Sequence, residues 1–247
     1  MTKIVVVMER IAIRRAHTVV VLNRDMEQLA HSFGQDRVVL APIGVDTERF
    51  IPPDRGWDPT GYLLSVCRLN DPRKGLDRLI RSYASMAGLR PSVPALILAG
   101  RGELPGALTR MIAELGLDER VRIYPDVPEA ELPALYRGAS VYLQASHEEG
   151  LGISVIEAMA CGLPVVGTET AGTRETIVDG ETGWLVNQTG DVERAIVERI
   201  FSVLDNEVRE MPFRARSRAV SLFSSQATLG RFLQIYEQLR DGNSARH

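Results

Sequence analysis

Two glutamates flank a glycine-rich turn in the middle of the sequence. Glu149 and Glu157 lie on either side of Gly150 and Gly152, directly before an apolar run with helical spacing. A glycine turn that opens a helix allows close backbone approach and presents unpaired N–H groups, an arrangement that suits phosphate. A carboxylate repels phosphate but is a strong acceptor for hydroxyl groups. The combination therefore predicts a ligand that carries both phosphates and alcohols.

Two basic residues follow another apolar run and supply the positive charge that phosphates require. Arg68 and Lys74 could together neutralise a diphosphate with charge-assisted hydrogen bonds. With Glu149 at the transferred sugar and Glu157 at the ribose, the pattern predicts binding of a nucleotide sugar. The competing interpretation is a surface loop with ordinary basic residues, a helix-dipole role for Glu149 and a solvated Glu157. The apolar neighbours of Glu157 in residues 155–159 argue for a partner.

The elements that must position these residues are short apolar runs alternating with helical patterns from residue 61 onward. The runs occupy residues 62–66, 95–100, 121–124, 141–146, 164–168 and 183–186. Such runs are typical of buried parallel strands joined by crossover helices. We therefore expect an α/β fold with a Rossmann-like open parallel sheet and helices on both faces. Ligands of such sheets bind beyond the carboxyl ends of the strands, where the glycines, cations and carboxylates gather.

Composition excludes several other classes of protein. The 29 basic and 32 acidic residues give a formal charge of −3, which does not favour nucleic acid. Cys67 and Cys161 lack metal-ligand spacing, so we expect no metal, packing in the core and a reducing, cytoplasmic setting. The apolar run at residues 4–8 is too short for a signal peptide or a membrane span. A basic face at residues 10–15 leaves peripheral contact with an anionic membrane as the alternative to a solvated helix.

The first part of the chain reads as separate from the main sheet. Residues 17–22 predict a buried strand and residues 25–33 a helix, and the proline- and glycine-rich residues 41–61 predict a linker. A lone strand and helix cannot bury both faces, so they should belong to a second sheet whose other strands are absent from this sequence.

Four segments, residues 44–52, 67–80, 98–104 and 135–186, together resemble the nucleotide-sugar-binding half of the retaining glycosyltransferases of family four. That family has the GT-B fold of two facing Rossmann-like domains. The resemblance runs from about residue 5 to about residue 240. Its hallmark, two glutamates separated by seven residues, is present as Glu149 and Glu157.

The resemblance implies transfer of a sugar from a nucleotide donor to an acceptor hydroxyl, with retention and without a required metal or a cofactor besides the donor. Arg68 and Lys74 would hold the diphosphate and stabilise the leaving group, and Glu149 would bind the donor sugar; these three are the expected catalytic residues. Glu157 would bind the ribose. The remaining expected donor-binding residues are Gly100, Arg101, Gly102, Val127, Gly150, Leu151, Gly152 and Ile153. The sequence departs from the family pattern at Ile43, Pro125 and Leu151, which leaves the base contacts open.

The resemblance also divides the chain. It implies a remnant of an N-terminal acceptor domain at 1–43, a linker at 44–60, the nucleotide-sugar domain at 61–222 and a closing helix at 223–247 that packs back on the N-terminal domain. We expect a fragment that binds donor and transfers poorly, with an acceptor that is a glycan, a lipid-linked sugar or a small molecule. The apolar face of the closing helix should be partly exposed; it comprises Leu229, Phe232, Leu233 and Tyr236.

One other function remains open, as do several residues: a nucleotide-sugar-binding module or half of a split enzyme. An epimerase or phosphorylase of the same fold is disfavoured, because the sequence shows no pyridoxal-binding lysine context and the epimerases do not share this combination of motifs. His147 and residues 169–172 follow strands and are further candidates for ligand contact, while Trp184 is expected in the core.

Overall fold

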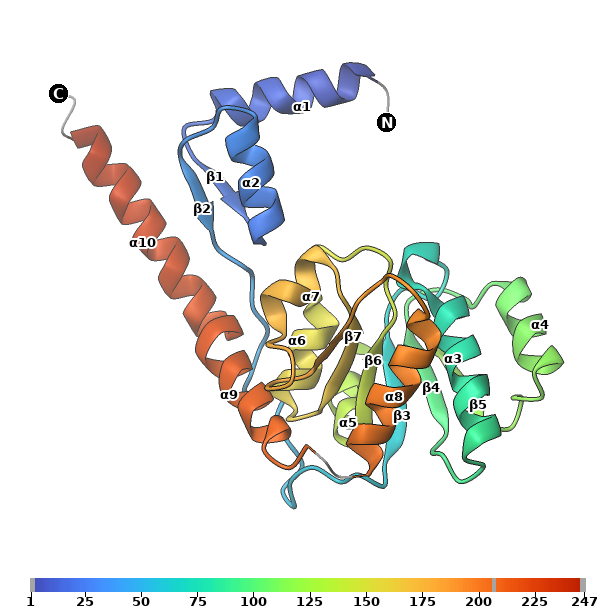
Figure 1. Cartoon of the computed structure of the whole chain (residues 1–247). Coiled ribbons are helices and arrows are strands. Elements are labelled where there is room, and N and C mark those ends of the chain that lie inside the picture. The colour runs from blue at the N-terminus through green and yellow to red at the C-terminus, as the bar shows by residue number, and fades with distance from the viewer. Residues whose placement is uncertain (1–2, 206–207, 245–247) are drawn as a thin grey trace.

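A parallel six-stranded sheet organises most of the chain (Figure 1). The computed structural model describes residues 3–205 and 208–244. The strands run in the order β5-β4-β3-β6-β7-β8, and every ladder is parallel. Their bounds are β3 Tyr62–Val66, β4 Leu96–Gly100, β5 Val121–Pro125, β6 Ala139–Gln144, β7 Val165–Thr168 and β8 Trp184–Val186. The predicted open α/β sheet is confirmed, and its strand order reverses between β3 and β6.

Helices cover both faces of this sheet, as expected. The elements are η1 Pro72–Lys74, α3 Leu76–Leu89, α4 Gly106–Glu114, η2 Glu129–Glu131, α5 Leu132–Arg137, α6 Ile153–Ala160, α7 Ala171–Thr176, α8 Val192–Leu204 and α9 Met211–Phe223. α3 and α8 pack together over one face, and α6 and α9 pack together over the other. Each face therefore has its own apolar core.

Along each buried strand, successive side chains enter the two cores alternately. Leu63 of β3 and Val141 of β6 enter the core beneath α3 and α8, whereas Leu64 and Tyr142 enter the core beneath α6 and α9. Successive side chains of a strand point to opposite faces, so a strand covered on both sides must be apolar throughout. The near-continuous apolar runs of the sequence have this origin.

A small unit precedes the main sheet. It comprises α1 Lys3–Arg15, β1 Val19–Val21, α2 Arg24–Ser32 and β2 Val38–Leu40. The predicted strand and helix are present, but the expectation of a lone strand was wrong, because β2 pairs with β1 in parallel and α2 is the crossover between them. β2 has only three residues and no alternation, so its sequence pattern is too short to detect.

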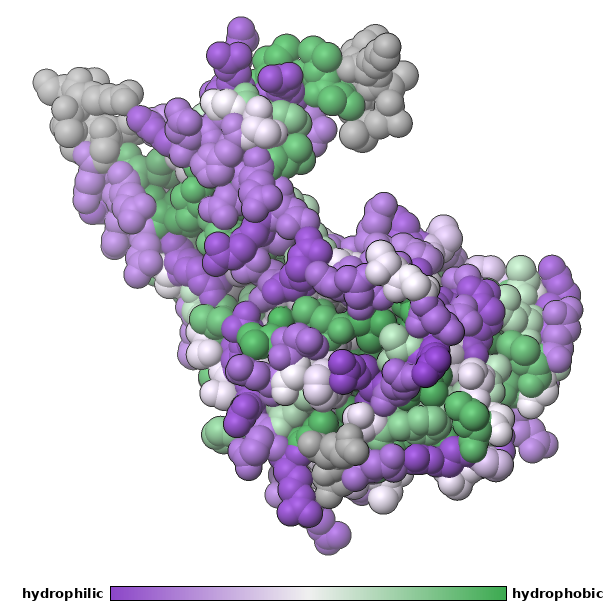
Figure 2. Space-filling view, viewed as in Figure 1, coloured by the Kyte–Doolittle hydropathy of each residue, from purple (hydrophilic) through white to green (hydrophobic). Residues whose placement is uncertain are grey.

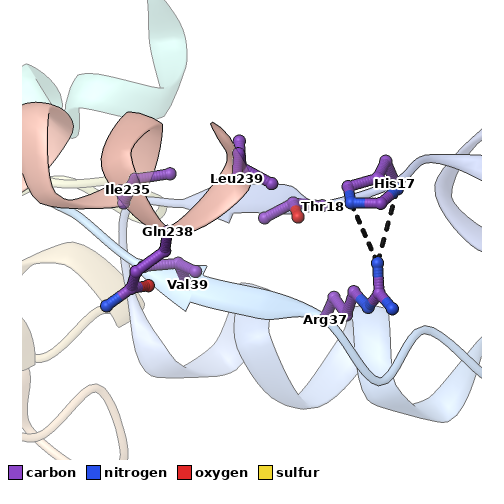
Figure 3. Close-up of a pocket in the computed structure, with 7 residues that line it drawn as sticks. All are labelled: His17, Thr18, Arg37, Val39, Ile235, Gln238 and Leu239. Carbon is purple, nitrogen blue, oxygen red and sulfur yellow. Dashed lines mark hydrogen bonds between the residues drawn. The ribbon is translucent and has the colours of Figure 1, made fainter. Parts of the chain in front are cut away.

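The chain closes with α10 Ser225–Ser244, which extends from the main domain toward the small unit (Figure 1). Val45 forms an isolated bridge with Ser224, and Nη1 of Arg231 donates to the carbonyl of Pro42 at 2.8 Å. A hollow of about 320 Å³ separates the helix from β1 and β2, with Ile235 on one side and Val39 on the other (Figure 3).

Apolar side chains of α10 are exposed, as expected from the sequence. Leu229, Leu233 and Tyr236 are exposed to solvent, while Phe232 is half-buried. Hydrophobic surface is visible along the helix where it nears the small unit (Figure 2). Within the described residues, no helix combines the length and apolar character needed to cross a bilayer.

Candidate functional site

A hollow of about 470 Å³ opens at the carboxyl ends of β3, β4 and β6. This edge of the sheet is where the strand order reverses, the position at which open α/β sheets bind ligands. Eight of the predicted site residues line it: Arg68, Lys74, Gly100, Arg101, Val127, Glu149, Ile153 and Glu157. The hollow beside α10 (Figure 3) contains none of them. The tertiary structure therefore brings most of the predicted residues to one place.

Lys74 and Glu149, which both line this hollow, form an ion pair. Nζ of Lys74 lies 2.7 Å from Oε2 of Glu149, and the two side chains are only 19% and 16% exposed. Nε2 of Gln144 donates to the same carboxylate oxygen at 2.9 Å. The sequence predicted a lysine ready for phosphate, whereas the folded protein presents one whose charge is already balanced. Because an ammonium carries three donors, it can share a phosphate oxygen without leaving the glutamate.

Two glycines bring these groups together. Gly75 ends η1 with φ +62°, and a Cβ there would lie 2.1 Å from the carbonyl oxygen of Ala145. Only glycine lets the loop after β3 approach the end of β6 so closely. Gly152 has φ +84° and precedes α6, which begins at Ile153 as predicted. The left-handed backbone turns the chain into the helix beside Glu149.

Glu157 also lines the hollow and has a protein partner. The hydroxyl of Tyr136, a fully buried residue, donates to Oε2 of Glu157 at 2.7 Å. Burial raises the pKa of Glu157, and the hydrogen bond from Tyr136 and the charge of Arg49 act in the opposite direction. The partner inferred from the apolar neighbours of Glu157 is therefore a tyrosine. The carboxylate still lines the hollow and can accept hydroxyl groups there.

Arg68 supplies a second positive charge between two hollows. Its side chain is exposed and lines both the main hollow and an adjoining one of about 390 Å³ beside α2. Within the described residues, its guanidinium forms no hydrogen bond or salt bridge, unlike Lys74. An unpaired guanidinium next to a neutralised lysine gives this part of the wall a net positive charge, which suits an anion.

Four of the predicted donor-binding residues lie outside the main hollow. Gly150 lines the adjoining hollow beside α2, whereas Gly102 donates its backbone N–H to Asp126 at 2.9 Å. Gly152 and Leu151 line neither hollow, and Leu151 is only 3% exposed within the core beneath α6. The role of these four residues as backbone hydrogen-bond donors to the ligand stays a prediction.

Most of the further candidates are engaged elsewhere, but Ala171 lines the adjoining hollow beside α2. His147 donates its backbone N–H to the carbonyl of Arg73. Nδ1 of its ring lies 2.8 Å from Nη2 of Arg78. Glu169 contacts Arg174, and Thr170 caps α7. None of these residues lines the main hollow.

Two residues expected in the core, Cys67 and Trp184, have features that the sequence did not predict. Cys161 is buried, whereas Cys67 is half-buried and forms part of the wall of the main hollow. Burial raises the pKa of the Cys67 thiol to about 12, so the thiol stays protonated. Trp184 packs against the core with Arg199 over its ring, and its buried indole N–H has no hydrogen-bond partner among the described residues.

Sequence reasoning missed several groups of the site. Ser65, Gln144, Ser146 and Ser154 are polar residues of the wall. The glutamine directly after the apolar residues 141–143 was the available signal, because a buried amide needs a partner. Asn23 gave no such signal: it caps α2 through the backbone N–H of Met26 and donates Nδ2 to the carbonyl of Gly150 at 2.6 Å. It joins the small unit to the glycine turn.

The chain is similar to one family of known proteins and to several curated relatives. The family described as "Glycosyl transferases group 1" matches residues 48–220. A GDP-mannose-dependent alpha-(1-6)-phosphatidylinositol monomannoside mannosyltransferase of Mycolicibacterium smegmatis is 39% identical over 166 residues, covering 60% of this chain and 42% of the relative. A D-inositol 3-phosphate glycosyltransferase of Frankia alni is 33% identical over 199 residues, covering 74% of this chain and 47% of the relative. The chain thus spans about half the length of these curated relatives.

Solved structures share the fold at low sequence identity. A sucrose-phosphate synthase from Thermosynechococcus elongatus superposes with a TM-score of 0.85 at 23% identity, covering 98% of this chain and 63% of that one. The pneumococcal O-GlcNAc transferase GtfA, solved in complex with UDP and GlcNAc, gives 0.77 at 23% identity, covering 89% and 44%. These similarities support the fold assignment.

Proposed function

The chain belongs to the group 1 glycosyl transferases, and from this premise we propose that its site binds a nucleotide sugar and passes the sugar to an acceptor hydroxyl. The observation that carries the proposal is one hollow whose wall contains the cations Arg68 and Lys74 together with the carboxylates of Glu149 and Glu157. Arg68 and Lys74 suit a diphosphate, Glu149 beside them suits the hydroxyl groups of a sugar, and Glu157 suits those of a ribose. No single group of the ligand would match all of these residues.

The reaction moves a glycosyl group between two oxygens. The bond from the anomeric carbon to the leaving phosphate breaks, a bond from that carbon to the acceptor oxygen forms, and the acceptor proton passes to the departing phosphate. Negative charge grows on the leaving diphosphate, so Arg68 and Lys74 would stabilise the transition state more than the ground state. Retention of the anomeric configuration is part of the proposal, as the family resemblance implies.

The identity of the base and sugar is proposed only as a class. One relative is described as GDP-mannose-dependent, and GtfA was solved with UDP and GlcNAc. GDP and UDP sugars are therefore the first candidates for this chain. The acceptor is proposed to be a polyol, a glycan or a lipid-linked sugar, and the small unit next to the glycine turn is the surface closest to where it would approach.

Calorimetry with GDP, UDP, ADP and their sugars tests the proposal. We expect at least one nucleotide sugar to bind, and Arg68→Ala to weaken it about tenfold or more through loss of a charge-assisted bond. The matched control is Arg110→Ala, an exposed arginine of α4 outside the hollow. A folded wild-type protein that binds none of these ligands would refute the proposal.

A second assay separates transfer from binding. Release of nucleoside diphosphate from the bound sugar donor is followed with glycerol, inositol phosphate or mannosides as acceptors. Turnover that is lost in Arg68→Ala supports a transferase. Tight binding without release under all of these conditions would favour the competing function, a nucleotide-sugar-binding module.

A further inference from the structure

The side chain of Gln144 is a primary amide at the end of a strand that is buried throughout. It ends β6, whose six residues are all buried, and is itself only 6% exposed. Burying a primary amide without partners is unfavourable, so a position of this kind normally carries an apolar residue. Here Nε2 donates to Oε2 of Glu149 at 2.9 Å, and the side chain lines the main hollow. The amide therefore serves the site more than the core.

The backbones at both ends of this hydrogen bond are held in place. Gln144 pairs with Gly167 of β7, and its carbonyl accepts from the hydroxyl of Thr168 at 3.3 Å. The carbonyl of Glu149 accepts from the backbone N–H of Gly172 at 2.9 Å. With both main chains held, the Gln144 amide and the Lys74 ammonium together hold Oε2 of Glu149 in place.

Both donors to this carboxylate end on the same oxygen atom. Lys74 and Gln144 each donate to Oε2 of Glu149, and within residues 3–205 and 208–244 no group donates to Oε1. The two donors differ in how they would respond to a ligand. A diphosphate attracts the ammonium of Lys74, whereas the neutral amide of Gln144 has no charge to be drawn away and does not titrate.

We propose that Gln144 is a positioning residue, which anchors Glu149 through Oε2 so that Oε1 stays available to the sugar while Lys74 also donates to the phosphates. The inference rests on the proposed function, because it concerns the same ligand. It makes the bound sugar, and not the diphosphate, dependent on Gln144. A residue that merely fills the end of β6 would affect both alike.

Gln144→Leu tests this, because leucine has similar volume and no donor. The probes are GDP-mannose with GDP and UDP-N-acetylglucosamine with UDP, titrated into the full chain. We expect the affinity for the sugar nucleotide to fall about tenfold, as for loss of one hydrogen bond to a charged group. The affinity for the bare diphosphate should stay within about twofold. Ser140→Ala is the matched control, because Ser140 is fully buried in the same strand, donates its hydroxyl to the carbonyl of Tyr62 and lies outside the hollow.

A double-mutant cycle with Glu149→Ala identifies the residue through which Gln144 acts. Once the carboxylate is absent, Gln144→Leu should cause no further loss of sugar-nucleotide affinity. Thermal unfolding checks that each variant folds. If Gln144→Leu does not fold, Gln144→Met takes its place.

Four results would overturn the inference. An equal loss of affinity for the sugar nucleotide and the diphosphate would mean that Gln144 only supports the strand. No loss of affinity for either ligand would mean that its amide has no part in binding. A full additional loss in the Glu149→Ala background would mean that Gln144 acts elsewhere. A wild-type chain that binds neither the sugar nucleotides nor GDP and UDP would overturn the proposed function as well, which distinguishes the two failures.

Discussion

Replacing Glu149 by glutamine should tighten the binding of a bare nucleoside diphosphate while weakening the preference for the attached sugar. The carboxylate neutralises Lys74 in the folded site, so a diphosphate now meets a lysine whose charge is balanced. Glutamine keeps the size and the acceptor of the side chain but removes its negative charge. The phosphates gain a free ammonium, and the sugar loses a charged acceptor.

The magnitude follows from the geometry of the pair. Nζ of Lys74 lies 2.7 Å from the carboxylate, and an ammonium donates to a phosphate oxygen at about 2.8 Å. A phosphate that shares this ammonium therefore lies about 5 Å from the carboxylate. At that distance two unit charges repel by about 1–3 kcal/mol for effective dielectric constants between about 80 and 20. Removing the carboxylate charge should tighten GDP or UDP by about 5- to 150-fold.

Calorimetry with GDP and UDP at low and at high salt measures this effect. The gain should be largest at low salt, since the side chains of the pair are not fully buried and mobile ions screen their charges. Glu148→Gln is the matched control: it removes the same charge from an adjacent exposed glutamate that forms no salt bridge within the described part of the chain. Its effect should stay within about threefold. If Glu149→Gln binds GDP and UDP no better than the wild type, Glu149 does not compete with phosphate for Lys74.

Three further predictions concern other groups of the site. Burial raises the pKa of Glu157 above 4.5, so its charged form destabilises the fold at neutral pH. Glu157→Gln should therefore raise the melting temperature at pH 7, and the gain should shrink as the pH falls through the raised pKa and vanish below about 4.5; an equal gain at pH 4 would contradict this. With a thiol pKa of about 12, Cys67 should react with a disulfide reagent at pH 8 on the order of a thousandfold more slowly than free cysteine. Fast modification of the native chain, with Cys161→Ala as background, would show that Cys67 is not desolvated. Asn23→Asp keeps the cap of α2 but loses the amide that donates to the carbonyl of Gly150. The free energy of unfolding should fall by about 1–3 kcal/mol, and the melting temperature by roughly 2–4 °C for each kcal/mol. Asn23→Ala should cost about 1 kcal/mol more through loss of the cap, and a smaller loss for alanine than for aspartate would refute the two-bond account.

The glycine turn and the cations illustrate how much the sequence predicts. Arg68 and Glu149 follow apolar runs that are continuous because the strands are buried on both faces. In a parallel sheet all strands end at the same edge, so residues after separate strands are expected to meet. The six strands of the main sheet and the edge that carries the hollow were predictable for this reason.

The small unit shows where sequence patterns fail. The three residues of β2 give no detectable alternation, and the strand exists because β1 offers a partner and α2 covers the pair. Asn23 looks like an ordinary helix cap in the sequence. Its second bond, to Gly150, joins positions 127 residues apart and depends on how the unit docks against the main domain.

The sequence by itself determined the fold class, the edge of the sheet that holds the site and the identity of the charged residues there. Local periodicity and the shared direction of parallel strands are enough to fix those. Only the tertiary structure decided which charges pair: Lys74 with Glu149 across 75 residues, Glu157 with Tyr136, and Gln144 with the same oxygen as Lys74. Hydrogen bonds depend on distances of a few tenths of an ångström, and those distances are set by packing around Gly75 and by the register of β6, which no local pattern encodes.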